Sequence, residues 1–176
     1  GCEANLFEEF KKIAEAAFFS GYFLINGGCK DEYKLKLTCI EFYYHEDDGN
    51  IKDEKKYLKG KDEFGYALGA VCPNPSGVDV LFDDPQKKYH ASFLIRGYKA
   101  IVPGKKEWEN NEKRKDWAPH DFWYDFFGGA NMLSNGKFSI EWIDETDNVV
   151  GSAEPMERIL KVNDGRLWGF KRVEKL

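Results

Sequence analysis

The sequence has no long hydrophobic run and no excess of basic residues. A membrane-spanning helix needs about eighteen or more consecutive apolar residues, and the 176 residues contain no such run, so we expect no membrane span. Lysine and arginine number 26 against 31 aspartates and glutamates, which gives a formal net charge of −5. Because a duplex-binding domain usually carries a basic face, this balance counts against strong non-specific DNA binding. Lys105, Lys106, Lys113, Arg114 and Lys115 supply one candidate for a local basic patch.

Motifs for metal binding and redox chemistry are also missing. The four cysteines, at positions 2, 29, 39 and 72, include no CxxC pair, so neither a zinc site nor a redox motif is indicated. His45, His90 and His120 are dispersed, without the spacing of metal ligands. We therefore expect no metal and no other cofactor. We expect a cytoplasmic protein, with lipid attachment at Cys2 as the alternative if the N-terminus is a processed one.

Aromatic residues, in contrast, are abundant. Five Trp, nine Tyr and fourteen Phe make up 16% of the chain, which favours a globular protein over a disordered one. No internal repeat, low-complexity run or linker divides the sequence. We therefore expect a single domain over residues 1–176.

Hydrophobic spacing predicts two helices and about six strands. Residues 5–19 carry apolar side chains at helical spacing, with Asn5 and Glu8 as a capping box. A second helix is expected from Asp116, through Pro119, to Phe127. The predicted strands are 35–44, 78–82, 90–98, 138–142, 158–162 and 167–173, and the last two flank a hairpin turn at 163–165. Because these elements follow no regular βαβ order, the sequence predicts an α+β fold with a largely antiparallel sheet.

The strand over residues 35–44 carries a carboxylate where an apolar residue is expected. Alternate side chains of a strand point to opposite faces, so Leu35, Leu37, Glu41 and Tyr43 share one face. This face is apolar at its start, which places Glu41 at or near the core. Charged groups are seldom buried unless they are paired or functional, so Glu41 is the first candidate for chemistry. The alternative is that the apolar face switches at Ile40 and leaves Glu41 in solvent.

Three segments of the sequence occur in the same order as the motifs of a known protein family. They are Ile40-Glu41-Phe42-Tyr43, then Phe93-Leu94-Ile95-Arg96-Gly97, then the glycine-containing segment Phe127 to Leu133. In this order and spacing, and with a helix before them, they resemble the alkyladenine (3-methyladenine) DNA glycosylase family. Ser76-Gly77-Val78-Asp79 lies between the first two segments. The resemblance covers most of residues 35–135 and implies a curved, largely antiparallel sheet flanked by helices.

The resemblance also implies roles for individual residues. Glu41 lies where the family has the general base that activates water, and Arg96 lies where it has an arginine near that water and the DNA backbone. Tyr43 would form a wall against which a flipped base stacks. His45 and Asp79 would contact the substrate, and Tyr66 would fill the gap left by the flipped nucleotide. The plain structural alternatives are that Tyr43 packs in the sheet and that Arg96 makes an ion pair, for example with Asp79.

The function expected from this resemblance is excision of alkylated or deaminated purines from damaged DNA. The sequence departs from the family at the pocket histidine, where the corresponding spacing gives Lys52, and ahead of the hairpin, where it reads Lys59-Gly-Lys61-Asp-Glu. Two alternatives therefore stay open. One is a module that kept the fold and binds a small molecule or a protein, and the other is a hydrolase of free nucleosides.

Overall fold

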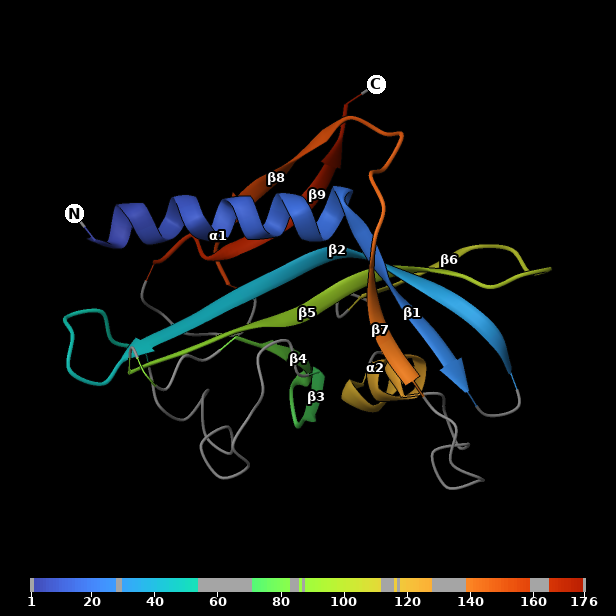
Figure 1. The fold of residues 1–176 in the computed structure, drawn as a ribbon, viewed down its shortest axis with the longest axis horizontal. Coiled ribbons are helices and arrows are strands. Elements are labelled where there is room, and N and C mark those ends of the chain that lie inside the picture. The colour runs from blue at the N-terminus through green and yellow to red at the C-terminus, as the bar shows by residue number, and fades with distance from the viewer. Residues whose placement is uncertain are drawn as a thin grey trace.

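The computed structural model describes residues 2–27, 30–53, 71–82, 86, 88–111, 116, 118–127, 139–158 and 165–175. Their helices and strands, labelled in Figure 1, are α1 (Cys2–Phe19), β1 (Gly21–Gly27), β2 (Lys30–Glu46), β3 (Val71–Asn74), β4 (Gly77–Leu81), β5 (Tyr89–Ile101), β6 (Trp108–Asn111), α2 (Pro119–Phe126), β7 (Ser139–Asp144), β8 (Gly151–Met156) and β9 (Gly169–Glu174). No helix in these ranges is both long and apolar enough to cross a membrane.

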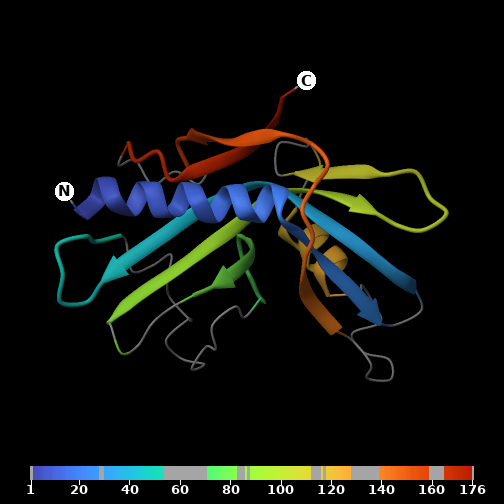
Figure 2. The ribbon, with the colours of Figure 1, turned by 45° about the horizontal axis from the view of Figure 1, so that its top comes forward.

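The nine described strands join in one curled antiparallel sheet. Their order is β3-β4-β5-β2-β1-β7, with β6 paired to β5 and the β8–β9 pair attached to β2. The central strand β2 pairs with β5 along one edge, while its other edge is shared by β1 and then β9. Figures 1 and 2 show β2 and β5 running side by side through the centre of the molecule. The predicted α+β class with a largely antiparallel sheet is confirmed.

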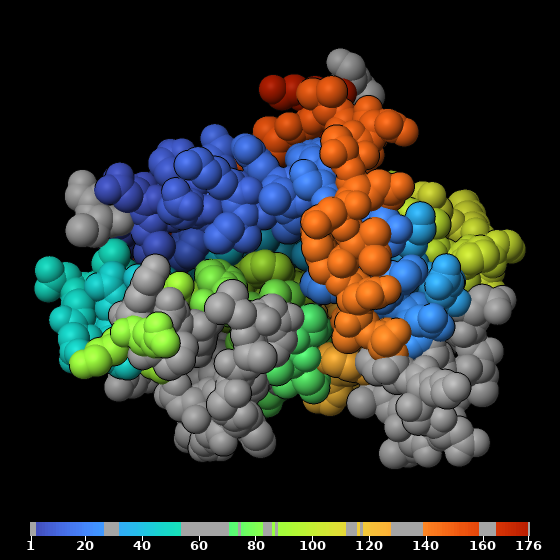
Figure 3. Space-filling model, viewed as in Figure 1, coloured from blue at the N-terminus to red at the C-terminus, as the bar shows by residue number. Residues whose placement is uncertain are grey.

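Helix α1 covers one face of the sheet with the predicted apolar stripe. The ring of Phe10 stacks on Phe42 of β2 at 4.3 Å, and Ala14 and Phe18 are buried beside it. The helix begins at Cys2, earlier than the predicted cap at Asn5, and an ion pair of 2.7 Å between Glu3 and Arg166 holds its first turn. In the space-filling view of Figure 3, the blue atoms of α1 and β1 lie next to the orange atoms of the segment that starts at residue 139 with β7.

Helix α2 packs on the opposite face, against the N-terminal half of β2 and its neighbours. It begins at Pro119, and the prediction that it starts at Asp116 is wrong. Ala118 caps the helix, because its backbone N–H donates a hydrogen bond of 3.1 Å to the Asp121 carboxylate. Phe122 contacts the ring of Tyr98 at 4.9 Å, and the Tyr98 hydroxyl donates a hydrogen bond to the Asp125 carboxylate. The two helices therefore cover different parts of β2 from opposite sides.

The sequence missed β1, β3, β6 and β8 as strands. Each of the first three is bounded or interrupted by glycine, proline or charged residues, and β8 carries Pro155 at its edge position. The predicted partner of the last strand was residues 158–162, but β9 pairs with β8, and Arg158 lies outside any strand. The predicted turn at 163–165 falls largely outside the described residues.

Candidate active site

Both faces of the C-terminal half of β2 are buried. The pairing of β2 with β5 is irregular between Leu37 and Ile40. The irregularity does not change which face the later side chains occupy, because both strands advance by three residues between the pair Leu37–Tyr98 and the pair Ile40–Ile95. Glu41 therefore keeps the same face as Leu37, and its exposed fraction is 0%. Ile40 and Phe42, on the other face, are buried as well, with Phe42 against α1. The alternative that placed Glu41 in solvent is wrong, because the sheet is covered on both sides at this point.

Glu41 lies in a group of buried charged residues drawn from three strands. Its Oε1 atom is 3.6 Å from Nε of Arg96, and the side chain of Arg96 is 6% exposed. Leu94 of β5 is the register partner both of Glu41 on β2 and of Asp79 on β4. The two carboxylates thus flank Leu94 on one face of the sheet, and Asp79 is also buried. Glu41, Arg96 and Asp79 are thus buried together on one face of the sheet.

Tyr43 follows on the same face, two residues after Glu41. Its side chain is 2% exposed. Burial, and second to it the nearby Glu41 carboxylate, raise the pKa of the Tyr43 hydroxyl. The hydroxyl therefore stays protonated through the physiological range and can act as a hydrogen-bond donor. The guanidinium of Arg158 lies over the Tyr43 ring at 4.8 Å, which fixes the ring by a cation–π contact.

Arg158 and Asp53 form a second buried ion pair that the sequence analysis missed. Their closest atoms, Nη1 and Oδ2, are 2.7 Å apart, and both side chains are 1% exposed. Arg158 also donates to the carbonyl of Phe42, and the Asp53 carboxylate accepts the N–H of Tyr44. Both backbone groups lie on β2 after Glu41, the last residue of β2 that is in register with β9. The Asp53–Arg158 pair therefore supplies hydrogen bonds that a neighbouring strand would otherwise supply at this edge. No local pattern could have indicated it, because the partners are 105 residues apart.

His45 belongs with this second pair and not with Glu41. It is buried, and its Nδ1 atom is 2.9 Å from the backbone oxygen of Asp53. This contact holds the segment that follows β2 against the strand, so the structure gives His45 a structural partner. Tyr66, the predicted wedge, lies outside the described residues. Within the described ranges, no group of three or more His, Cys, Asp or Glu side chains could hold a metal ion.

The arrangement combines a carboxyl group, a guanidinium group and a protonated phenol on one buried face of the sheet. Such a set can orient a small polar molecule and stabilise positive charge beside Glu41. Arg96 also approaches the backbone oxygen of Ser76, at 3.5 Å, in the turn between β3 and β4. The structure thus places Glu41, Tyr43, Arg96 and Asp79 on one buried face of the sheet, and their roles in a site stay a prediction. Comparisons of the chain with protein families, curated proteins and solved structures find no match.

Proposed function

We propose that the protein hydrolyses the N-glycosidic bond of a modified purine, on a fold of the alkyladenine DNA glycosylase type, with Glu41 as the general base. The observation that carries the proposal is the complete burial of the Glu41 carboxylate at 3.6 Å from Arg96, on the same face as Tyr43. Arg96 lies close enough to hold this carboxylate in place, and bulk water is excluded from it. We assign Glu41 the role of taking a proton from one bound water molecule.

In the proposed reaction, water attacks the sugar carbon that bears the purine, and the bond from that carbon to the purine nitrogen breaks. Glu41 accepts the proton of the water, while its negative charge stabilises the oxocarbenium-like transition state. The purine leaves with the bonding electron pair and takes up a proton. Arg96 positions the Glu41 carboxylate, Tyr43 contacts the base, and Asp79 contacts the substrate from the far side of Leu94.

One observation favours a second candidate, a binding module without hydrolytic activity. The exposed fractions of Glu41, Tyr43 and Arg96 are 0%, 2% and 5%. A base that meets both water and a nucleotide needs an opening, whereas a purely structural ion pair needs none. The net charge of −5 also counts against duplex DNA as the bound molecule and favours a smaller ligand.

The experiment measures release of hypoxanthine and ethenoadenine from duplex DNA, from single-stranded DNA and from free nucleosides at low salt. Glu41→Gln keeps the shape of the side chain and removes the base. The matched control is Glu32→Gln, an exposed glutamate of the same strand. Release by the wild type and the control, and a loss of about 10²-fold or more in Glu41→Gln, would support the proposal. Equal release by Glu41→Gln would remove Glu41 from the mechanism, and no release on any substrate would favour the binding module.

A further inference from the structure

The other face of the sheet carries a hollow of about 370 Å³ at the N-terminal half of β2. It is formed by side chains of β2, β5, β6 and β9 and by the turn around Asp147. Helix α1 covers only the C-terminal half of this face, so the hollow is open to solvent while Phe42 farther along β2 is buried. Small-molecule sites begin at about 300 Å³. The hollow is therefore large enough for a small ligand and lies on the opposite face from Glu41.

A row of three charged residues crosses the floor of the hollow. Lys36 of β2 is the direct register partner of Lys99 of β5, and Lys99 is the register partner of Glu109 of β6. Like charges directly opposite each other on neighbouring strands are destabilising. The two lysines are also partly buried, with side-chain exposed fractions of 28% and 36%. This is an unfavourable arrangement for the empty protein.

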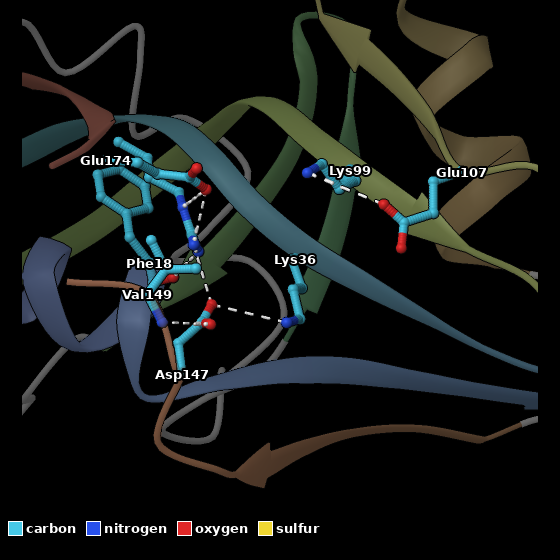
Figure 4. A network of polar contacts seen from close by, with 8 residues as sticks. Phe18, Lys36, Lys99, Glu107, Asp147, Val149 and Glu174 are labelled. Atoms are coloured by element: carbon cyan, nitrogen blue, oxygen red, sulfur yellow. Dashed lines mark hydrogen bonds and ion pairs between the residues drawn. The ribbon is translucent and has the colours of Figure 1, made fainter. Parts of the chain in front are cut away.

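The hollow's own carboxylates only partly neutralise the two lysines. Lys36 is 3.6 Å from Asp147 and Lys99 is 3.9 Å from Glu107, both beyond normal hydrogen-bond distance (Figure 4). Asp147 is held more closely by Arg172, whose Nη2 atom is 2.9 Å from Oδ2 of Asp147. Both ammonium groups therefore keep N–H donors for a further acceptor.

Arg172 and Glu109 also line the hollow, and they differ in whether they can bind a ligand. Arg172 already donates to Asp147, to Glu174 and to the backbone oxygen of Phe18, so it forms a wall and not a binding group. Glu109 is exposed, and its side chain makes no hydrogen bond or ion pair within the described part of the chain, although its backbone pairs with β5. The row thus offers two cations at one end and one anion at the other.

We infer that this hollow binds a small zwitterion the size of a dipeptide. The carboxylate would lie between Lys36 and Lys99, and the ammonium group would face Glu109. Neighbouring strands are about 4.8 Å apart, so these two positions are separated by about one and a half strand spacings, or about 7 Å. An extended dipeptide spans about 7 Å. Ile101 and Val149 line the same hollow and would contact short aliphatic side chains.

Binding of L-alanyl-L-alanine at low ionic strength, measured by calorimetry and by the rise in melting temperature, tests this inference. N-acetyl-Ala-Ala lacks the ammonium group and Ala-Ala amide lacks the carboxylate. We expect Ala-Ala to bind and each blocked form to bind at least about tenfold more weakly, since charge-assisted hydrogen bonds are each worth about 1.5 kcal/mol or more. Equal binding of the acetylated form would overturn the zwitterion in favour of a simple anion site. Absence of binding up to about 10 mM Ala-Ala would overturn the site itself.

Three variants locate the site, and a fourth is the control. Lys36→Gln, Lys99→Gln and Glu109→Gln should each weaken Ala-Ala binding about tenfold. Lys105→Gln removes an exposed lysine of the β5–β6 turn and should leave binding unchanged. Lys99→Gln should also leave the melting temperature of the ligand-free protein unchanged or raise it, because it removes the repulsion with Lys36. Unchanged binding in all three variants, or loss of binding in the Lys105 control, would contradict the assignment.

Discussion

Removal of either partner of the Asp53–Arg158 pair should be among the most damaging single substitutions in this protein. Both side chains are 1% exposed and their closest atoms are 2.7 Å apart, so the remaining partner would be a buried charge without compensation. Breaking such a pair costs about 3–5 kcal/mol. A domain of this size is stabilised by about 5–15 kcal/mol. Asp53→Leu or Arg158→Met should therefore lower the melting temperature by about 6–20 °C.

The double variant separates the charge effect from the loss of edge hydrogen bonds. Asp53→Leu combined with Arg158→Met leaves no isolated charge, so its loss of stability should be smaller than the sum of the two single losses. It should still be less stable than the wild type, because the Phe42 carbonyl and the Tyr44 N–H lose their partners, at about 1–3 kcal/mol for each buried group.

Urea unfolding of the wild type, both single variants and the double variant gives the complete thermodynamic cycle. Asp48→Ala is the control, because Asp48 pairs with Lys88 at 3.0 Å at the exposed surface and its removal should have no measurable effect. If the loss of stability in the double variant equals the sum of the two single losses, the reasoning is refuted, because additivity means that the two side chains do not interact. A loss below about 1 kcal/mol in the single variants would refute it as well.

Two further predictions concern ionisation. Burial disfavours the charged form of Asp147, but hydrogen bonds from Arg172 and from the N–H of Val149 outweigh it and hold the pKa of that carboxyl below its ordinary 3.8. Its contribution is therefore complete above pH 3.8 and is lost as the pH falls below that value, so Asp147→Asn should destabilise the protein in urea at pH 7 and less at lower pH. Burial, aided by nearby Asp125 or Glu41, raises the pKa of Tyr33, Tyr43 and Tyr98 above 10.0, so their contribution is lost as the pH rises above 10. Absorbance at high pH should show these three ionising only with unfolding, and Tyr43→Phe should reduce that step by one tyrosine; early ionisation of all three would contradict their burial.

Local sequence patterns predicted the parts of the fold that depend on periodicity. The apolar spacing of residues 5–19 predicted α1, and the alternation from Leu35 to Tyr43 correctly placed Glu41 on a buried face. The contact between Glu41 and Arg96, in contrast, depends on the pairing of β2 with β5, which no local pattern specified. The roles of these residues in catalysis stay a prediction.

The same patterns did not predict features that depend on which strands become neighbours. Strands β1, β3 and β6 are short and have mixed composition, so their extended form comes from pairing with longer strands. The Asp53–Arg158 pair and the Lys36–Lys99–Glu109 row each join segments distant in the chain. A shift of one residue in register would turn every side chain of a strand to the other face.

Side-chain periodicity is a local property of helices and strands, so it was enough to predict the α+β class, the apolar stripe of α1 and the face of β2 that carries Glu41. Three other features became visible only in the folded chain: the burial of both faces of β2, the residues that bond to its edge beyond β9, and the two lysines that meet across the open half of the sheet. These features depend on strand register and on the placement of the helices. Both are fixed by packing between segments far apart in the chain, and no local pattern encodes them.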